Sequence, residues 1–149
     1  MTTAGEAPFC PFCAIADGRI KAHKIYEGER ICAFLDIQPV RPGHALIVPR
    51  QHYDYFEQMP ADLAAEIMAL GQKIARAQKH LYGVERVGFM FSGGDVAHAH
   101  AHLVPMHEKT DVTSLRYFHV DNPQMQLPAR APDEHLTATA TEMRGQLGG

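Results

Sequence analysis

Three histidines stand at alternate positions in the segment DVAHAHAHLVP, and their spacing is the strongest chemical feature of the sequence. On a β-strand, residues two apart point to the same face, so His98, His100 and His102 would form a row while small alanines face the other way and leave room for close packing. At a rise of about 3.3 Å per residue the outer Cα atoms lie about 13 Å apart, whereas imidazole nitrogen binds zinc at about 2 Å. One ion is therefore not expected to bind all three, and we predict that the three histidines have different functions.

Two of the three cysteines form a C-x-x-C motif, Cys10-Pro-Phe-Cys13. Three cysteines are too few, and odd in number, for a disulfide framework, so in a reducing compartment the motif suggests metal or redox chemistry. The alternative is that Cys10 and Cys13 are two small buried residues, because C-x-x-C alone is a modest signal. Cys32 stands alone in an apolar stretch, and we predict that it is buried.

The composition excludes several classes of function. A chain of 149 residues, 46% hydrophobic and 21% charged, is typical of a soluble globular protein, and its length predicts one domain over residues 1–149. The net charge of −3 gives no basic field for a nucleic-acid polymer, so a phosphate-bearing ligand is expected to be small. The N-terminus has neither a basic start nor an apolar stretch, and no run approaches the ~20 apolar residues of a membrane span. We expect a cytoplasmic protein without a membrane partner.

Hydrophobic patterning predicts five strands, over residues 24–28, 30–35, 44–49, 86–92 and 98–105. The first two strands flank Glu27-Gly28, a dipeptide suited to a hairpin turn. The last two are joined by the short turn from Ser92 to Asp95.

Two helices are predicted. The main helix begins at Pro60, ends at Gly83, and has apolar residues three, four or seven apart: Leu63, Ile67, Leu70, Ile74 and Leu81. A shorter C-terminal helix is expected from Asp133, after an irregular segment rich in proline, with an apolar stripe of Leu136, Ala140, Met143 and Leu147.

Three segments resemble the histidine triad family of nucleotide-binding hydrolases and transferases: CPFCAIADG, AFLDIQPVRPGHALIVPRQH and HAHAHLVP. The resemblance covers residues 10–105. Beyond it, HEKTDVTSLRY resembles the continuation of a bacterial subgroup, and residues 106–149 form a divergent extension. The family implies an α+β fold, a five-stranded antiparallel sheet with helices on one side, commonly doubled as a homodimer about a twofold axis.

The resemblance implies cleavage of a phosphorus bond in a nucleoside phosphoramidate or nucleotide ester, through a covalent nucleotidyl-histidine. His100 corresponds to the nucleophile, and His102 and His44 correspond to the positions that flank the phosphate. Imidazole suits the nucleophile, because it is largely neutral at about pH 7 and one nitrogen can attack while a hydrogen bond orients the other.

The resemblance also assigns the nucleoside site. Asp36 matches the carboxylate that accepts the ribose hydroxyls, and Ser92, before the triad, is a further candidate nucleotide-binding residue. Apolar side chains match the wall around the base, although the plain alternative is that they are core: Phe12, Ile15, Phe34, Ile37 and Leu46. Apolar packing discriminates poorly among purines, so adenine and guanine are both expected.

Some branches of the family, including the uridylyltransferases, bind a structural zinc ion. The matching residues here are Cys10, Cys13, His52 and His98. Two thiolates and two imidazoles make a closed tetrahedral set. The triad would then divide its functions: His98 for metal, His100 for chemistry and His102 for phosphate.

The turn before the triad departs from the family pattern. Many members have N-x-G-x-x-x-G-Q-[ST]-V here, whereas this chain has the shorter segment 92–96 with Asp95 at the hydroxyl position. That carboxylate would repel a phosphate unless protonated or turned away, although the amides of Gly93 and Gly94 could replace part of the lost contact. Two alternatives therefore remain: a nucleotide-binding regulatory protein with weak or vestigial catalysis, and a zinc hydrolase, which would need an open coordination position.

Overall fold

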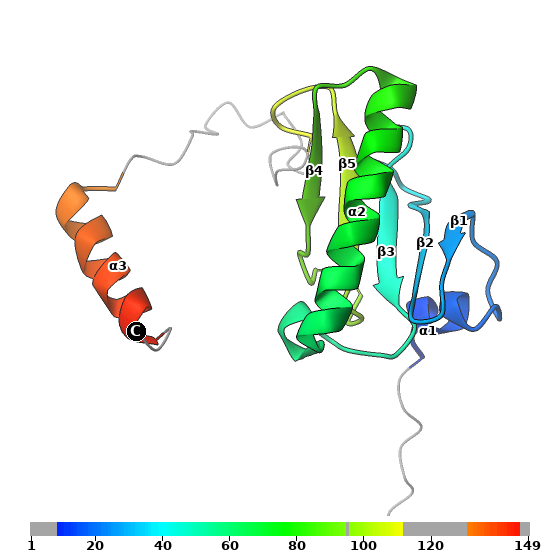
Figure 1. The fold of residues 1–149 in the computed structure, drawn as a ribbon, viewed down its shortest axis with the longest axis horizontal. Coiled ribbons are helices and arrows are strands. Elements are labelled where there is room, and N and C mark those ends of the chain that lie inside the picture. The colour runs from blue at the N-terminus through cyan, green and yellow to red at the C-terminus, as the bar shows by residue number, and fades with distance from the viewer. Residues whose placement is uncertain (1–8, 95, 112–130, 147–149) are drawn as a thin grey trace, which may run out of the picture. The chain divides into compact units, whose positions relative to one another are not determined.

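A five-stranded antiparallel sheet lies at the centre of the fold (Figure 1). The computed structural model of the protein describes residues 9–94, 96–111 and 131–146. The strands are β1 (Lys24–Glu27), β2 (Ile31–Leu35), β3 (Ala45–Pro49), β4 (Arg86–Met90) and β5 (Ala101–Met106), in the spatial order β1-β2-β3-β5-β4. Each neighbouring pair is antiparallel. The predicted α+β class and the five-stranded sheet are confirmed.

Helix α2 (Ala61–Tyr82) covers one face of the sheet (Figure 1). It begins after Pro60 and ends at Gly83, as predicted, and the φ of 65° at Gly83 is the left-handed conformation that favours glycine after a helix. Four residues of its predicted stripe pack against the sheet: Leu63, Ile67, Leu70 and Ile74. The placement of Leu81 in that stripe was wrong, because its side chain is 69% exposed. In the last turns Gln78 is buried, and Tyr82 lies against Gly43.

The inner strands divide their side chains between two apolar clusters, one on each face of the sheet. Ile47, Ala101 and Leu103 belong to the cluster under α2, whereas Leu46 belongs to the cluster on the opposite face. His102 is opposite Leu46 in the β3–β5 register, so it lies on the face away from α2. The expected alternation of histidine and alanine is confirmed here, with the small side chains toward the helix.

Helix α1 (Pro11–Ala16) is an element that periodicity does not predict, because six residues are too few for a helical repeat. Pro11 occupies its first turn, and the Cys10 side chain caps it by accepting a hydrogen bond from the Cys13 backbone N–H at 3.4 Å. Phe12 and Ile15 pack against the cluster on the face opposite α2. The sheet therefore has a helix on each face rather than helices on one side only. Cys32 lies in this second cluster and is buried, as predicted.

Strand β5 begins at Ala101, not at residue 98 as predicted. Pro49, at the end of β3, has no N–H with which to extend the β3–β5 ladder. The Ala99 N–H instead donates to the Tyr53 carbonyl oxygen at 2.7 Å. The prediction that all three histidines of the triad lie on one strand was therefore wrong: His98 and His100 precede the strand. The predicted strand ending at residue 92 also ends earlier, at Met90.

The described residues fall into two units, and helix α3 (Asp133–Gln146) belongs to the second. It begins at the predicted residue, and Asp133 and Glu134 in its first turn interact favourably with the helix dipole. Leu136 of its predicted stripe is about half exposed, and Leu147 lies outside the described residues. The expectation of one domain over residues 1–149 stays a prediction. None of the described helices is long and apolar enough to span a membrane.

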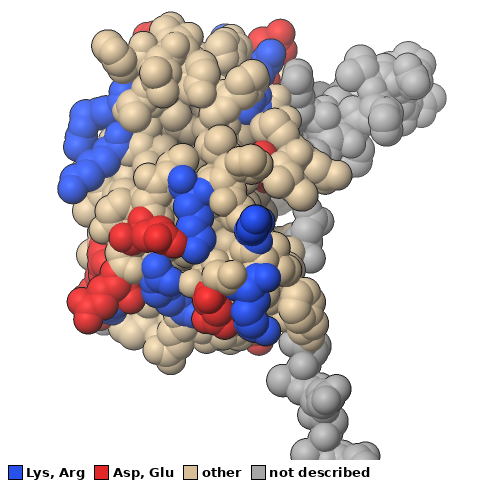
Figure 2. Space-filling view, turned by 90° about the vertical axis from the view of Figure 1, so that its right-hand side faces the viewer, with Lys and Arg blue, Asp and Glu red and all other residues tan. Residues whose placement is uncertain are grey.

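Charged side chains of both signs share the surface at the β1 edge of the sheet. Figure 2 shows this face, where Lys and Arg lie beside Asp and Glu. In this part of the fold Lys24 pairs with Glu27, and Arg30 pairs with Asp62 at 2.9 Å. This face therefore offers no uniformly positive surface of the kind that binds a nucleic-acid polymer.

Candidate active site and metal centre

His100 is held in one tautomer. Its Nδ1 lies 2.7 Å from the backbone carbonyl oxygen of His98. Because a carbonyl oxygen only accepts hydrogen bonds, Nδ1 carries the ring proton, and in the neutral imidazole the lone pair is on Nε2. The ring is buried and meets the Phe12 ring edge-on, with centroids 4.9 Å apart. The backbone thus orients the His100 ring and leaves the lone pair of the neutral imidazole on Nε2.

His44 and His102 form a hydrogen-bonded pair between neighbouring strands. His44 Nδ1 accepts a hydrogen bond from the Val40 backbone N–H at 3.1 Å, so its ring proton is on Nε2, which donates to His102 Nδ1 at 2.9 Å. In neutral His102 the ring proton is then on Nε2. The His100 and His102 rings are adjacent, with centroids 4.9 Å apart. The arrangement places an N–H donor beside the candidate nucleophile.

Asp36 lies next to this pair, directly after β2. Its Oδ2 is 3.7 Å from His44 Nε2, and its Oδ1 accepts a hydrogen bond from the Gln38 backbone N–H at 2.8 Å. Burial lowers the pKa of His44, while the Asp36 carboxylate opposes that effect. His44 is therefore a neutral donor at physiological pH, and Asp36 is a partly exposed acceptor suited to hydroxyl groups.

Four of the five predicted wall residues pack together on the face of α1. Phe34 and Leu46 are buried, and Phe12 and Ile15 pack against them. Phe34 and Leu46 are thus core residues, as the alternative interpretation stated. A core residue can also line a ligand site. Ile37 differs, because its side chain is 85% exposed. A core role is excluded for Ile37, and a large apolar side chain next to Asp36 faces solvent.

Cys10, Cys13, His52 and His98 converge into one cluster. Each cysteine Sγ lies 3.4 Å from His98 Nδ1, Cys13 Sγ lies 3.3 Å from His52 Nδ1, and the two Nδ1 atoms are 3.1 Å apart. Around a tetrahedral zinc ion, with bonds of about 2.3 Å to sulfur and about 2.0 Å to nitrogen, neighbouring ligand atoms are about 3.3 to 3.8 Å apart. The donor types and their spacing fit zinc.

Both histidines of this cluster present a lone pair to it. His98 Nε2 donates to the Pro49 carbonyl oxygen at 2.9 Å, and His52 Nε2 donates to Asp54 Oδ1 at 2.8 Å. The Nδ1 atoms of the neutral rings therefore have no proton, and two lone pairs 3.1 Å apart repel each other unless a cation lies between them. A carbonyl or carboxylate that orients the second nitrogen is typical of metal-ligating histidines.

The protonation of this cluster would change on binding a cation. Burial lowers the pKa of His98, so its imidazole is neutral and able to act as a ligand. Burial, together with the neighbouring Cys10 side chain, raises the pKa of Cys13 to about 11. Two thiolates at neutral pH therefore require a bound cation, because the cation lowers the pKa of its ligands.

A second group of possible metal ligands consists of Asp36, His44 and His102, whose ligand atoms lie within 4.8 Å of one another. Its hydrogen bonding argues against an ion. The Val40 N–H occupies His44 Nδ1, so His44 Nε2 carries a proton and has no lone pair for a metal. Among the described residues, the cysteine-histidine cluster is thus the better metal site.

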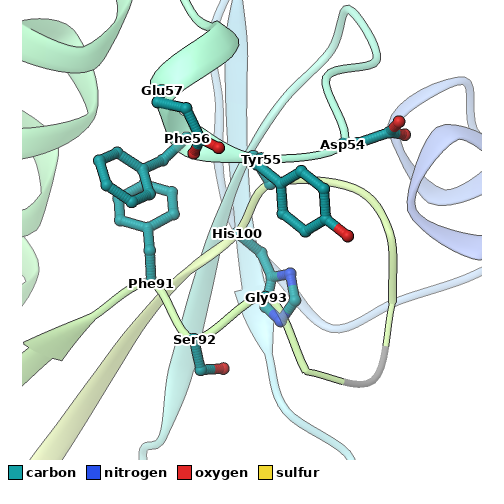
Figure 3. A pocket seen from close by; sticks show the side chains of 9 residues that line it. Asp54, Tyr55, Phe56, Glu57, Phe91, Ser92, Gly93 and His100 are labelled. Carbon is teal, nitrogen blue, oxygen red and sulfur yellow. The ribbon is translucent and has the colours of Figure 1, made fainter.

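A pocket of about 110 Å³ opens beside His100 (Figure 3). We call it the Tyr55 pocket, and its lining residues are Asp54, Tyr55, Phe56, Glu57, Phe91, Ser92, Gly93, Ala99 and His100. The predicted nucleotide-binding residue Ser92 lies here, and none of the predicted wall residues lines this pocket. Asp95 lies outside the described residues, so its expected effect on phosphate binding stays a prediction.

Gln78 supports the site and is missed by sequence reasoning. Its Nε2 donates to the carbonyl oxygens of Gly43 at 2.8 Å and Leu103 at 3.0 Å, the chain neighbours of His44 and His102. Gln78 is only 3% exposed, and its Oε1 has no hydrogen-bond partner in the described part of the chain. The sequence did contain a signal: Gln78 stands four positions after Ile74, on the apolar stripe of the helix. A polar side chain there is expected to be buried, and a buried carboxamide requires hydrogen-bond partners.

Arg41 and Asp111 join the loop before β3 to the segment after β5. Arg41 donates hydrogen bonds to the Asp111 carboxylate at 3.0 and 3.1 Å, and the backbone N–H groups of His107 and Glu108 donate to the same carboxylate. Burial tends to raise the pKa of Asp111, but these hydrogen bonds lower it overall. The pair stabilises the loop that carries His44. Sequence reasoning had no signal for it, because the partners are 70 positions apart.

A five-stranded antiparallel sheet with three alternate histidines, two just before β5 and the third within it, defines a histidine triad protein. The chain matches the model of the HIT domain over residues 17–109. It therefore belongs to the HIT family.

Proteins of similar sequence include an uncharacterized HIT-like protein and a phosphoramidase. The chain is 37% identical over 103 residues to an uncharacterized HIT-like protein of Methanocaldococcus jannaschii, which covers 66% of this chain and 80% of that protein. It is 34% identical over 101 residues to the adenosine 5′-monophosphoramidase of Saccharomyces cerevisiae, over 67% of this chain and 64% of that protein.

Two solved structures illustrate the likeness in fold. A HIT family member from Bacillus subtilis superposes with a TM-score of 0.75 at 27% identity, covering 94% of this chain and 98% of that one. A zinc-bound histidine triad family protein from Mycobacterium smegmatis has a TM-score of 0.62 at 27% identity, covering 92% and 96% of the two chains.

Proposed function

We propose that this protein is a nucleotide hydrolase or transferase that cleaves a phosphoramidate or phosphate ester of a purine nucleotide, through a covalent nucleotidyl-His100. The observation that carries the proposal is the 2.7 Å hydrogen bond from His100 Nδ1 to the His98 carbonyl oxygen, which leaves the lone pair on Nε2. Membership of the HIT family, and a relative named as an adenosine monophosphoramidase, support the reaction class.

The reaction consists of two displacements at phosphorus. In the first, the lone pair of His100 Nε2 forms a bond to phosphorus, the bond from phosphorus to the leaving nitrogen or oxygen breaks, and the leaving group takes up one proton. In the second, a water oxygen forms a bond to phosphorus, the phosphorus–Nε2 bond breaks, and the water gives up one proton. The net change is the addition of one water; in a transfer reaction another acceptor replaces it.

His102 and His44 would stabilise the charge that grows on the phosphoryl oxygens. The His44–His102 hydrogen bond leaves the proton of neutral His102 on Nε2, where it can be donated to such an oxygen. A preorganised donor of this kind contributes on the order of 3 kcal/mol to transition-state stabilisation. His44, held by Val40 N–H, polarises His102 and fixes its orientation.

The nucleoside would lie between Asp36 and the apolar wall. Asp36 accepts hydrogen bonds from the ribose hydroxyls, and Phe12, Ile15, Phe34 and Leu46 form the wall beside the base. The exposed side chain of Ile37 supports this placement, because a bound purine would remove its apolar surface from water. Both adenine and guanine satisfy such a wall.

A structural zinc ion held by Cys10, Cys13, His52 and His98 is part of the proposal. Four protein ligands leave no open position for water, which favours a structural ion over a zinc hydrolase. The ion would tie α1 to the segment before β5, and so would position both Phe12 and the His98 carbonyl group that orients His100. The zinc-bound relative from Mycobacterium smegmatis supports this part.

The expected homodimer and cytoplasmic location belong to the same proposal. Both rest on membership of the HIT family rather than on contacts of this chain. Light scattering on the purified protein should give twice the mass of one chain, and the mass of a single chain would reject the dimer.

The proposed reaction is tested by incubating the protein with adenosine 5′-phosphoramidate, followed by product analysis and by intact-mass measurement after an alkaline quench. We expect release of adenosine monophosphate and a transient mass increase of one adenylyl group. His100→Ala should lose the adduct and reduce turnover to below about a tenth of wild type. His80→Ala, which removes an exposed histidine of α2, is the matched control. Equal turnover by the two variants would reject the nucleophile, and nucleotide binding without turnover by wild type would favour the regulatory alternative.

A further inference from the structure

Cys10 and Cys13 lie close together at the start of α1. Cys10 caps the helix, Cys13 stands one turn later, and each Sγ is 3.4 Å from His98 Nδ1. The two Sγ atoms are within 4.8 Å of each other. Cysteines in a C-x-x-C motif at the start of a helix can form a disulfide with each other, as they do in disulfide oxidoreductases. The pair therefore has a possible chemistry besides metal binding.

Both cysteines are accessible from solvent. Their side chains are partly exposed, and the neighbouring His52 is exposed. Cys32 differs, because it is buried in the cluster opposite α2. Cysteines that bind zinc are thiolates, and oxidation of cysteine follows thiolate character and exposure. An oxidant should therefore react at Cys10 and Cys13 rather than at Cys32.

A disulfide between Cys10 and Cys13 would lie within one segment of the chain. Both cysteines belong to α1 and its cap, whereas His52 follows β3 and His98 precedes β5. A disulfide has no thiolate to bind a metal ion, so oxidation would replace links between three segments by one bond inside the first. The Nδ1 lone pairs of His52 and His98, 3.1 Å apart, would then repel each other, and the exposed His52 ring would rotate away.

Phe12 connects the two cysteines to the candidate nucleophile. It stands between them in the sequence, and its ring meets the rings of His98 and His100 edge-on, with centroids 6.0 and 4.9 Å apart. His98 also orients His100, because the His98 carbonyl oxygen is 2.7 Å from His100 Nδ1. Oxidation of the cysteines would therefore act on His100 through two neighbours, the Phe12 ring and the His98 carbonyl group.

The other end of α1 has an anchor that oxidation leaves intact. Arg50 donates hydrogen bonds to the carbonyl oxygens of Ala16 at 2.6 Å and Gly28 at 2.8 Å. Ala16 is also buried in the cluster on this face of the sheet. We therefore expect oxidation to loosen the N-terminal end of α1, while the sheet and α2 remain folded.

We propose that Cys10 and Cys13 are a reversible oxidation site, at which a hydroperoxide forms a disulfide, releases the metal ion and lowers the reactivity of His100. The effect on reactivity rests on the proposed function, whereas disulfide formation and metal release do not. One sulfur attacks the peroxide: an S–O bond forms, the O–O bond breaks and the alcohol leaves. The second sulfur then forms the S–S bond and displaces water. The two sulfurs lose two electrons, which reduce the hydroperoxide to an alcohol and water, and solvent supplies two protons to the thiolates' products.

The test treats zinc-loaded wild-type protein with a small molar excess of hydrogen peroxide. Relative to the reduced protein, the mass should fall by two hydrogen atoms, peptide mapping should link Cys10 to Cys13, and a zinc-binding dye should detect about one released ion per chain. Hydrolysis of adenosine 5′-phosphoramidate should fall by about tenfold or more, with an unchanged circular dichroism spectrum. A thiol reductant with added zinc should restore the activity, whereas oxidised methionine would survive this treatment.

The matched control is Cys32→Ala, which should show the same disulfide, zinc release and relative loss of activity as wild type. Thiols that stay reduced, zinc that stays bound, or sulfinic acids in place of the disulfide would overturn the oxidation site. A disulfide with unchanged hydrolysis would overturn the connection to His100. Absence of hydrolysis by the reduced protein would overturn the proposed function alone, because the mass and the released zinc still decide the oxidation site.

Discussion

His44 Nε2 donates a hydrogen bond to His102 Nδ1 across 2.9 Å, and this bond fixes the tautomers of both rings. Its direction is set by Val40, whose N–H occupies the other nitrogen of His44. A change of tautomer in either ring would leave two donors or two lone pairs facing each other. The pair therefore acts as one unit, in which the ring proton of neutral His102 is on Nε2.

The pKa of His44 should lie below the ordinary histidine value of about 6.5, because burial lowers it. Since the unfolded chain then binds the proton more readily, the contribution of His44 to stability is present above about pH 6.5 and declines as the pH falls toward the lower, folded pKa. Nitrogen-15 NMR of the imidazole should show the Nε2–H tautomer of His44 at neutral pH, and protonation with a midpoint below the ordinary value. Protonation with an ordinary pKa, or the Nδ1–H tautomer, would contradict the hydrogen-bond direction.

Purified protein should contain about one zinc ion per chain by elemental analysis. Cys10→Ser should lower both the zinc content and the melting temperature, because a ligand of a closed site is lost. Cys32→Ala is the control: it creates a small cavity in the cluster opposite α2 and should destabilise without releasing zinc. Zinc-free protein whose melting temperature is the same in wild type and Cys10→Ser would mean that Cys10 and Cys13 hold no metal ion.

Gln78→Leu should lower the free energy of unfolding by about 1–3 kcal/mol, because the carbonyl groups of Gly43 and Leu103 lose their donor. As these carbonyls flank the histidine pair, the same variant should lower kcat more than it raises KM. Gln72→Leu, at an exposed position of α2, should change neither value measurably. A fall in stability with an unchanged kcat would leave Gln78 a purely structural residue.

Asp111→Asn should destabilise the protein at neutral pH by about 1–3 kcal/mol, measured by denaturant unfolding. Asp111 has a folded pKa below the ordinary value of about 3.9, so its stabilising contribution is present above about pH 4 and is lost as the pH falls through the folded pKa. The difference between variant and wild type should therefore shrink in acid. A difference that is the same at neutral pH and in strong acid would mean that the Arg41–Asp111 pair does not stabilise the folded state.

The sequence predicted the elements whose residues repeat with a clear period. The stripe of Leu63, Ile67, Leu70 and Ile74 located α2, and Pro60 and Gly83 located its ends. Helix α1 was missed because it is too short to show a period, although Pro11 after a capping Cys10 was a usable signal. The start of β5 was wrong because it depends on Pro49 of another strand.

The candidate site was predicted as a set of residues but not as a geometry. The structure brings Cys10, Cys13, His52 and His98 together, as the resemblance implied, yet the tautomers that aim their lone pairs come from backbone and Asp54 contacts that no spacing encodes. Contacts between distant parts of the chain, such as Arg41 with Asp111 and Gln78 with Gly43, depend on the folded path and were missed for the same reason.

Cleavage in two displacements through His100 has a definite stereochemical outcome at phosphorus, which can be measured. The substrate is an adenosine 5′-phosphoramidate made chiral by one sulfur atom at phosphorus and hydrolysed by wild-type protein in isotopically labelled water. Each in-line displacement inverts the configuration, so a nucleotidyl-His100 intermediate predicts net retention. Net inversion would mean that water attacks the substrate directly, and would exclude the nucleotidyl-His100 intermediate.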